Sequence, residues 1–330
     1  MRKEAENRRQ TNLTRASPIL PVSVSPIPMN VMYPFDHPTV ARLITAALEE
    51  DLGRGDVTTM ATIPPDCTAT GTITAKADLV IAGLPLARMV LNTVDPTAGV
   101  RLLKAEGSGV KKGEVVLELW GSAAGLLVAE RTLLNFLQHL SGVATLTRRF
   151  VDAVAGTKCK IIDTRKTLPG FRLLDKYAVT QGGGTNHRMG LDDGVLIKDN
   201  HITVCGGVGA AVRRARSRTS ALLRIEVECT TLTEVQEAIA AQADIILLDN
   251  MSTGQMRDAV QLVKGRALLE ASGNMTLERV REVAETGVDF ISVGALTHSA
   301  PAVDLSMMIA TEGQSPKSKV HSEESGGRTL

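Results

Sequence analysis

The chain has 330 residues, 43% of them hydrophobic, and a formal net charge of +1, values that are ordinary for a globular protein with room for two domains. This balance gives no support for nucleic-acid or membrane binding, and aromatic residues at 2% leave too few rings for a base-stacking surface. The four cysteines are scattered without a CxxC pair, so reduced thiols are expected rather than a disulfide framework or a zinc site.

The two ends of the chain have the composition of disordered segments. Residues 1–35 contain Pro, Ser and Arg but no apolar core of a secretory signal, so we predict a disordered extension there. Glu4 and Glu6 interrupt its basic character, which leaves a mitochondrial transit peptide weakly supported and a cytoplasmic location expected. Residues 313–330 are polar and are predicted to be a disordered tail.

The first ordered part, residues 36–143, is predicted to be an α/β domain of its own. Helical periodicity covers residues 40–52, and short strand-like runs follow at 71–76 and 114–119 between Gly and Pro residues. A long amphipathic helix is predicted over residues 126–140.

That helix carries Arg131 beside Glu130. Taken alone, these two residues are more simply explained as a solvated ion pair than as part of a site.

Residues 144–298 alternate between apolar strand-like runs and amphipathic segments. Each apolar run ends at a polar or small residue, and the runs lie at 161–162, 195–197, 223–227, 245–248, 267–269 and 290–293. Segments 231–242 and 276–287 have apolar residues at helical spacing behind a capping Thr. Later strand ends follow at intervals of about 21 to 23 residues, near the minimum for one strand and helix. This regularity predicts a closed parallel barrel whose strand ends converge on one active-site face.

Cations follow the first two apolar runs directly. Arg165 and Lys166 come after the first run, Lys198 follows the second, and His187 and Arg188 lie between them. Acidic residues nearly balance the cations over residues 160–201, so their positions rather than the bulk charge predict a site for an anionic substrate.

Other motifs in the chain have simpler explanations. Without further information, Glu228 and Asp249 at neighbouring strand ends are better explained as members of structural ion pairs. The glycines at 182–184 lack the GK[ST] of a P-loop, and those at 206–209 lack the preceding strand and acidic partner of a dinucleotide site.

Beyond these patterns, residues 39–309 resemble the quinolinate phosphoribosyltransferase family, the decarboxylating enzymes of NAD synthesis. Eight motifs occur in the order expected of the family: ERTLLNFLQHLSG, DTRKTLPG, KYAV with GGGTNHRMG, LIKDNH, IEVE, LLDNM, EASGN and TGVDFISVGALTHS. The resemblance implies an N-terminal α/β sandwich domain over 36–143 and an incomplete, six-stranded β/α barrel over 144–298. A helix over 299–312 is expected to pack back on the N-terminal domain.

The resemblance also implies a reaction and a homodimer or higher homo-oligomer. Quinolinate and phosphoribosyl pyrophosphate would give nicotinate mononucleotide, pyrophosphate and carbon dioxide, with Mg²⁺ held mainly by the pyrophosphate and not in a dedicated metal site. Lys166, Glu228 and Asp249 would be catalytic. In the family, the arginine matching Arg131 reaches into the barrel of the partner subunit.

Binding residues are implied by the same motifs. Those for the two carboxylates of quinolinate are Arg131, Thr164, Arg165, Lys166, His187, Arg188 and Lys198. Those for the phosphoribosyl group are Lys166, Lys198, Glu228, Asp249, Ser272, Gly273, Asn274, Val293, Gly294 and Ala295. Asn274 stands where many family members have a second Gly.

Two other functions stay open at this point. A related phosphoribosyltransferase with another acceptor, such as the paralogue associated with molybdenum transport, would share most motifs, but the full DTRKT, NHR and KDNH set favours quinolinate. A non-catalytic barrel that binds a sugar phosphate would not need Arg131, Arg165, Lys166 and Arg188 together.

Overall fold

The computed structural model describes residues 34–311, which lie within one compact unit of the chain. The predictions of a disordered extension, up to residue 33, and of a disordered tail at 313–330 lie outside the described residues. Pro34–Asp36 form a 3-10 helix, and Phe35 is buried with its ring centroid 4.8 Å from that of Tyr177. The extension was therefore predicted to end two residues too late.

The N-terminal domain contains the predicted helix and strands. Its elements are α1 (Pro38–Leu52), α2 (Val57–Thr62), β1 (Thr68–Ala75), β2 (Leu79–Val80), α3 (Leu84–Val94), β3 (Gly99–Leu102), β4 (Gly109–Val110) and β5 (Val115–Ser122). Pro38 begins α1 at a position where a backbone N–H would have no helical partner, and the His37 ring accepts a hydrogen bond from Thr39 N at 3.2 Å.

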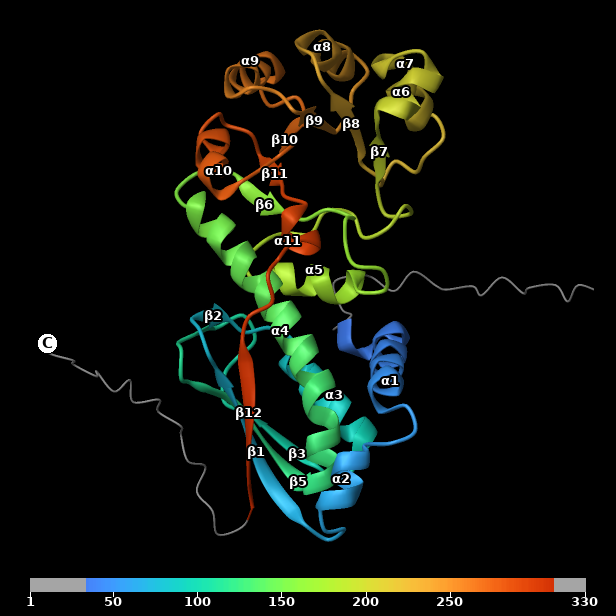
Figure 1. Cartoon of the computed structure of the whole chain (residues 1–330). Coiled ribbons are helices and arrows are strands. Elements are labelled where there is room, and N and C mark those ends of the chain that lie inside the picture. Colours follow the sequence, from blue (N-terminus) through green and yellow to red (C-terminus); the bar gives the residue numbers. More distant parts are fainter. Residues whose placement is uncertain (1–33, 312–330) are drawn as a thin grey trace, which may run out of the picture. The chain divides into compact units, whose positions relative to one another are not determined.

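The main sheet of this domain has the strand order β12-β1-β5-β3, and its outermost strand comes from the far end of the chain (Figure 1). The predicted helix over 299–312 is wrong: residues Leu305–Thr311 form β12, antiparallel to β1. Leu305 and Met307 are buried while Ser306 between them is only half-buried and Met308 is exposed, which matches the period of two of a strand; the buried Ala310 departs from this alternation. The segment does pack on the N-terminal domain, through backbone pairing with β1.

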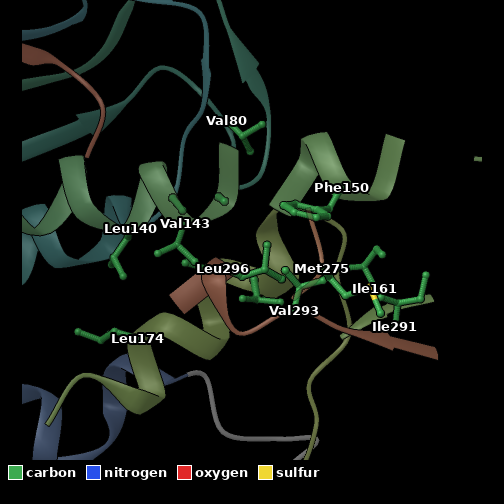
Figure 2. Close-up of a cluster of buried hydrophobic side chains, with 14 of the residues drawn as sticks. Val80, Leu140, Val143, Phe150, Ile161, Leu174, Met275, Ile291, Val293 and Leu296 are labelled. Carbon is green, nitrogen blue, oxygen red and sulfur yellow. The ribbon is translucent and has the colours of Figure 1, made fainter. Parts of the chain in front are cut away.

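Helix α4 (Ala123–Ala153) is 31 residues long and extends well beyond the predicted 126–140. Ser122 caps its start by accepting a hydrogen bond from Gly125 N at 3.0 Å. In its second half, Leu140, Val143 and Phe150 lie in one buried cluster with side chains from the barrel (Figure 2). Helix α4 therefore packs in one continuous hydrophobic cluster with residues of both domains.

The C-terminal domain is built on a six-stranded parallel sheet of order β6-β11-β10-β9-β8-β7 (Figure 1). Its strands are β6 (Lys160–Ile162), β7 (Val195–Ile197), β8 (Ile225–Cys229), β9 (Ile245–Asp249), β10 (Leu268–Ser272) and β11 (Phe290–Ser292). Its helices are α5 (Arg172–Gln181), α6 (Asp199–Cys205), α7 (Val208–Arg216), α8 (Leu232–Ala240), α9 (Thr253–Val263), α10 (Leu277–Ala284) and α11 (Ala295–His298).

The sheet does not close. Strands β6 and β7 do not pair with each other among the described residues, and beside β6 a single bridge joins Ile162 to Thr185. The closed barrel expected from strand spacing is therefore wrong, and the incomplete six-stranded barrel is confirmed. Over residues 34–311, no helix has the length and apolar character needed to cross a bilayer.

Candidate active site

The carboxyl ends of the barrel strands surround two adjoining cavities. The large cavity has a volume of about 650 Å³, and the small cavity has a volume of about 170 Å³. Both are lined by Thr164, Lys166, Lys198, Ser272 and Ser292. The predicted convergence of polar strand ends is confirmed by this arrangement.

The loop after β6 is anchored by a buried ion pair that sequence reasoning did not find. Asp163, with no exposed surface, accepts hydrogen bonds from Lys176 Nζ, from His187 N at 2.8 Å and from Asn186 Nδ2 at 2.6 Å. Lys176 is also buried, and its ammonium donates to His187 O at 2.9 Å. Burial raises the pKa of Asp163 and lowers that of Lys176, so holding both charges inside costs free energy. The pair fixes the loop at 163–166 against the segment at 186–188.

The small cavity is lined by two guanidinium groups whose Nε atoms have no partner among the described residues. Arg165 Nε and Arg188 Nε are buried and make no hydrogen bond among residues 34–311. Arg188 is oriented by one bond, from Nη1 to Gly194 O at 2.9 Å. Burial and the nearby Arg165 lower the pKa of Arg188, because both disfavour a further positive charge. An anion in this cavity would satisfy both guanidinium groups.

Lys166 stands between the two cavities. Its backbone is held on both sides, because Lys166 N donates to Thr164 Oγ1 at 3.1 Å and Lys166 O accepts from Thr297 Oγ1 at 2.6 Å. Within the described part of the chain its exposed ammonium has no hydrogen-bond or ion-pair partner. The backbone is therefore fixed while the charge stays available to a ligand.

The large cavity has carboxylates on one side. Glu228 and Asp249 lie at the ends of the adjacent strands β8 and β9, and Lys198 Nζ is 3.6 Å from Glu228 Oε2. Burial raises the pKa of Glu228; Lys198 opposes that shift and the charge of Asp249 adds to it. Asn250, which sequence reasoning missed, donates from Nδ2 to Asp249 Oδ2 at 2.6 Å.

Two loops on the other side of the large cavity have backbone N–H groups available. Gly273 has a φ of 101°, and a Cβ there would clash with Asn250 Oδ1, so the close approach requires glycine. Asn274 has a φ of 46°, a left-handed conformation that glycine adopts freely and asparagine tolerates. The N–H groups of Gly294 and Ala295 have no hydrogen-bond partner within residues 34–311.

The structure corrects the prediction that Val293 binds the phosphate. Its N–H donates to Ile162 O at 2.9 Å within the sheet, and its side chain is buried in the cluster of Figure 2, so it has nothing to offer a phosphate. His298, which was not among the predicted site residues, lines the large cavity one helical turn beyond Gly294.

Most of the other predicted residues meet at these two cavities, but Arg131 does not. It is exposed on α4 and lines neither cavity of its own chain.

Two acidic side chains that sequence reasoning missed lie inside the barrel: Glu226 on β8 and Glu270 on β10, with 4% and 2% of their surfaces exposed. A glutamate in the middle of an apolar strand is a signal that could have identified them.

Comparison with protein families decides the assignment of the chain. A model of the quinolinate phosphoribosyl transferase N-terminal domain matches residues 56–141, and a model of the C-terminal domain of the same family matches residues 143–308. The chain belongs to the quinolinate phosphoribosyl transferase family. The family resemblance read from the eight motifs is thereby confirmed.

Individual members of the quinolinate phosphoribosyl transferase family are similar over most of the chain. A relative from Oryza sativa subsp. japonica, named chloroplastic nicotinate-nucleotide pyrophosphorylase (carboxylating), is 46% identical over 297 residues, covering 84% of this chain and 80% of the relative. A relative from Mycobacterium leprae (strain TN), named nicotinate-nucleotide pyrophosphorylase (carboxylating), is 46% identical over 270 residues, covering 80% of this chain and 95% of the relative. The solved structure of the nicotinate-nucleotide pyrophosphorylase from Francisella tularensis matches with a TM-score of 0.78 at 41% identity, covering 82% and 96%.

Proposed function

We propose that the chain transfers a phosphoribosyl group from phosphoribosyl pyrophosphate to the ring nitrogen of quinolinate. The products are nicotinate mononucleotide, pyrophosphate and carbon dioxide, and the reaction serves NAD synthesis. The observation that carries the proposal is the pairing of cavities: guanidinium groups whose buried Nε atoms have no partner within residues 34–311 line the small one, and carboxylates and open N–H groups line the large one. A small aromatic dianion fits the small cavity, and a phosphoribosyl group fits the large cavity. The names of relatives that cover most of the chain agree.

Quinolinate is proposed to bind in the small cavity. Arg165 and Arg188 each present a planar fork that matches a carboxylate, and Thr164, His187 and Lys198 complete the wall. A charge pair at 4 Å is worth about 4 kcal/mol at an effective dielectric of 20, so a few such contacts are enough to orient the ring. Holding the ring nitrogen towards the large cavity would place it near the anomeric carbon of the second substrate.

The phosphoribosyl group is proposed to bind in the large cavity. Its phosphate would accept hydrogen bonds from the loops at 272–274 and 294–295, while Lys166 and Lys198 would contact the anionic groups at the boundary of the cavities. Glu228 and Asp249 would accept the ribose hydroxyls and stabilise the positive charge that builds on the ribose as pyrophosphate leaves.

We further propose Mg²⁺ as a companion of the pyrophosphate. Burial chiefly, and the charge of Asp249 to a smaller extent, raise the pKa of Glu228; a nearby cation would favour its ionised form, and oxygen ligands are those that Mg²⁺ prefers. The ion would therefore be bound mainly through the pyrophosphate, facing these two carboxylates. When bound, it neutralises the charge of the pyrophosphate. A cytoplasmic location is also proposed, since the four cysteines are unpaired as they would be under reducing conditions.

Acceptor choice tests this function. With purified protein and phosphoribosyl pyrophosphate, quinolinate should give nicotinate mononucleotide and carbon dioxide, and nicotinate should react at least about 100-fold more slowly. Nicotinate lacks the 2-carboxylate, so part of the guanidinium set would stay buried without a partner. Mononucleotide and carbon dioxide formation should both be followed, the latter from quinolinate labelled in the 2-carboxylate. Equal rates with the two acceptors would reject the assignment.

The place of Arg131 leads to a proposal about assembly. Because Arg131 is exposed and lines neither cavity of its own chain, we propose a homodimer in which it enters the small cavity of the partner. Arg131→Ala and Lys166→Ala homodimers should then both be nearly inactive. Refolded as an equal mixture, about half the dimers should be mixed, each with one intact site, so activity should return to about a quarter of wild type. A mixture that stays inactive, although mass spectrometry detects mixed dimers, would show that Arg131 does not act across the subunits.

A further inference from the structure

Below the substrate cavities the barrel interior contains a layer of acidic side chains. Side chains on a strand alternate, so Glu226 faces the interior two positions before Glu228, and Glu270 does so two positions before Ser272. His187 joins them, with Nε2 at 3.0 Å from Glu226 Oε2 and 3.5 Å from Glu270 Oε2. A barrel interior is usually filled by branched apolar residues, so acidic side chains at these positions are unusual and suggest a function.

The surroundings of the two carboxyl groups favour a proton shared between them. His187 Nδ1 accepts a hydrogen bond from Arg188 N at 2.7 Å, so Nε2 is the ring nitrogen that faces the two carboxyl groups. Two ionised glutamates at this place would be adjacent buried like charges. Glu226 Oε1 is buried and has no donor among the described residues; a proton on Glu270 would supply one. Burial and the charge of Glu226 raise the pKa of Glu270 well above its usual range, which also favours a proton on Glu270.

Glu270 also lies between two cavities. It lines the small cavity on the substrate side, and it lines a third cavity of about 230 Å³ at the opposite end of the strands, together with Phe290 and Arg224. His187 and Arg188 line both as well. A group in this place can give a proton to the substrate side and take one from solvent at the other end.

The proposed reaction needs such a proton. Attack of the ring nitrogen on the anomeric carbon expels pyrophosphate with the electron pair of the broken C–O bond. The bond from ring C2 to its carboxylate then breaks, carbon dioxide leaves, and the electron pair stays on C2 beside the positively charged nitrogen. C2 must then take up one proton.

We propose that Glu270 is the acid that protonates C2 after carbon dioxide leaves, with Glu226 holding that proton in place beforehand. The O–H electron pair remains on the Glu270 carboxylate, and the pair regains a proton from water through the third cavity. This inference rests on the proposed function. A metal site is the alternative explanation, since the ligand atoms of His187, Glu226 and Glu270 lie within 4.8 Å of one another. Arg188 and Arg224 on the wall of the third cavity disfavour a metal cation there.

Separate measurement of pyrophosphate and carbon dioxide tests the step. In single turnovers with quinolinate labelled in the 2-carboxylate, wild type should release one carbon dioxide per pyrophosphate without a lag. Glu270→Gln keeps a donor for Glu226 but no acidic proton. It should form pyrophosphate within about threefold of the wild-type rate and carbon dioxide about 100-fold more slowly, with the dicarboxylate mononucleotide accumulating. If both products slow together, or neither slows, the inference is wrong.

The Glu226→Gln variant gives an independent reading if Glu270→Gln does not fold. Removing the negative neighbour lowers the pKa of Glu270, so the loss of carbon dioxide release on raising the pH should begin at lower pH than in wild type. The other charged groups that face Glu270 are kept in this variant: His187, Arg188, Asp193 and Arg224 on one side, and Arg165, Lys166 and Lys198 on the other. An unchanged pH profile overturns the proposal, as does a stoichiometric divalent ion found in the purified wild type. Wild type that forms neither product would instead reject the proposed function.

Discussion

Lys176→Met should lower the free energy of unfolding by about 3 to 5 kcal/mol and remove nearly all activity, although Lys176 touches neither cavity. The substitution leaves Asp163 as a buried charge without its cation, and breaking one side of a buried pair has this cost. Activity should fall with it, because Asp163 and Lys176 together join the loop that carries Arg165 and Lys166 to His187. Urea unfolding at fixed protein concentration and steady-state turnover are the measurements.

Lys158 offers a matched control for this prediction. It forms an ion pair of the same chemistry, with Nζ at 2.7 Å from Asp289 Oδ1, but 60% of its side chain is exposed. Lys158→Met should therefore cost less than about 1 kcal/mol and leave turnover unchanged. Adding Asp163→Asn to Lys176→Met removes the stranded charge and should restore part of the stability without restoring activity. A Lys176→Met protein as stable as wild type would show that the pair is not an anchor.

Lys166→Ala should lower turnover by about 100- to 1,000-fold and move the thermal midpoint by no more than about 2 °C. The two effects separate because the ammonium has no partner within residues 34–311, while the backbone of the residue is held independently by Thr164 and Thr297. Truncation thus removes a charge from the site without removing a contact from the fold. Steady-state kinetics and thermal unfolding of the same preparations check both parts.

Lys160→Ala is the control for this variant, because Lys160 is an exposed lysine at the start of β6, the strand whose other end leads into the loop of Lys166. It should leave both turnover and the thermal midpoint unchanged. If Lys166→Ala instead unfolds many degrees below wild type, Lys166 is a structural residue and the interpretation of the site changes.

The sequence was sufficient for the parts of the fold that depend on local pattern. Apolar runs that end in polar residues correctly located all six barrel strands, and because parallel strands present their carboxyl ends on one face, the site followed from them. Whether the barrel closes depends instead on which edge strands meet. On the side of β6 away from β11, Thr185 rather than another strand pairs with Ile162, and no spacing between later strands carries that information.

Two misses have tertiary causes. The segment at 305–311 is a strand because β1 offers it an unpaired edge, and its short alternation of Leu, Met and Ala does not distinguish a strand from a helix locally. Lys176 lies on a helix, where a lysine is usually solvated. Its partner Asp163 is 13 residues earlier in the chain, and the two meet only in the folded structure. The predicted roles of the cavity residues remain predictions that the experiments above address.

The pairing of β12 with β1 has a consequence for how the protein is made. Thr70, early in the chain, hydrogen-bonds to the carbonyl of Ala310 at 3.3 Å, so the first sheet is completed by residues that leave the ribosome after the whole barrel. Until then β1 presents an open edge, the feature through which nascent chains pair with one another. The N-terminal domain is therefore exposed to misassembly for as long as the barrel is being synthesised. If the gene were cut between the two domains, β12 would be made apart from β1, and the edge of β1 would stay open.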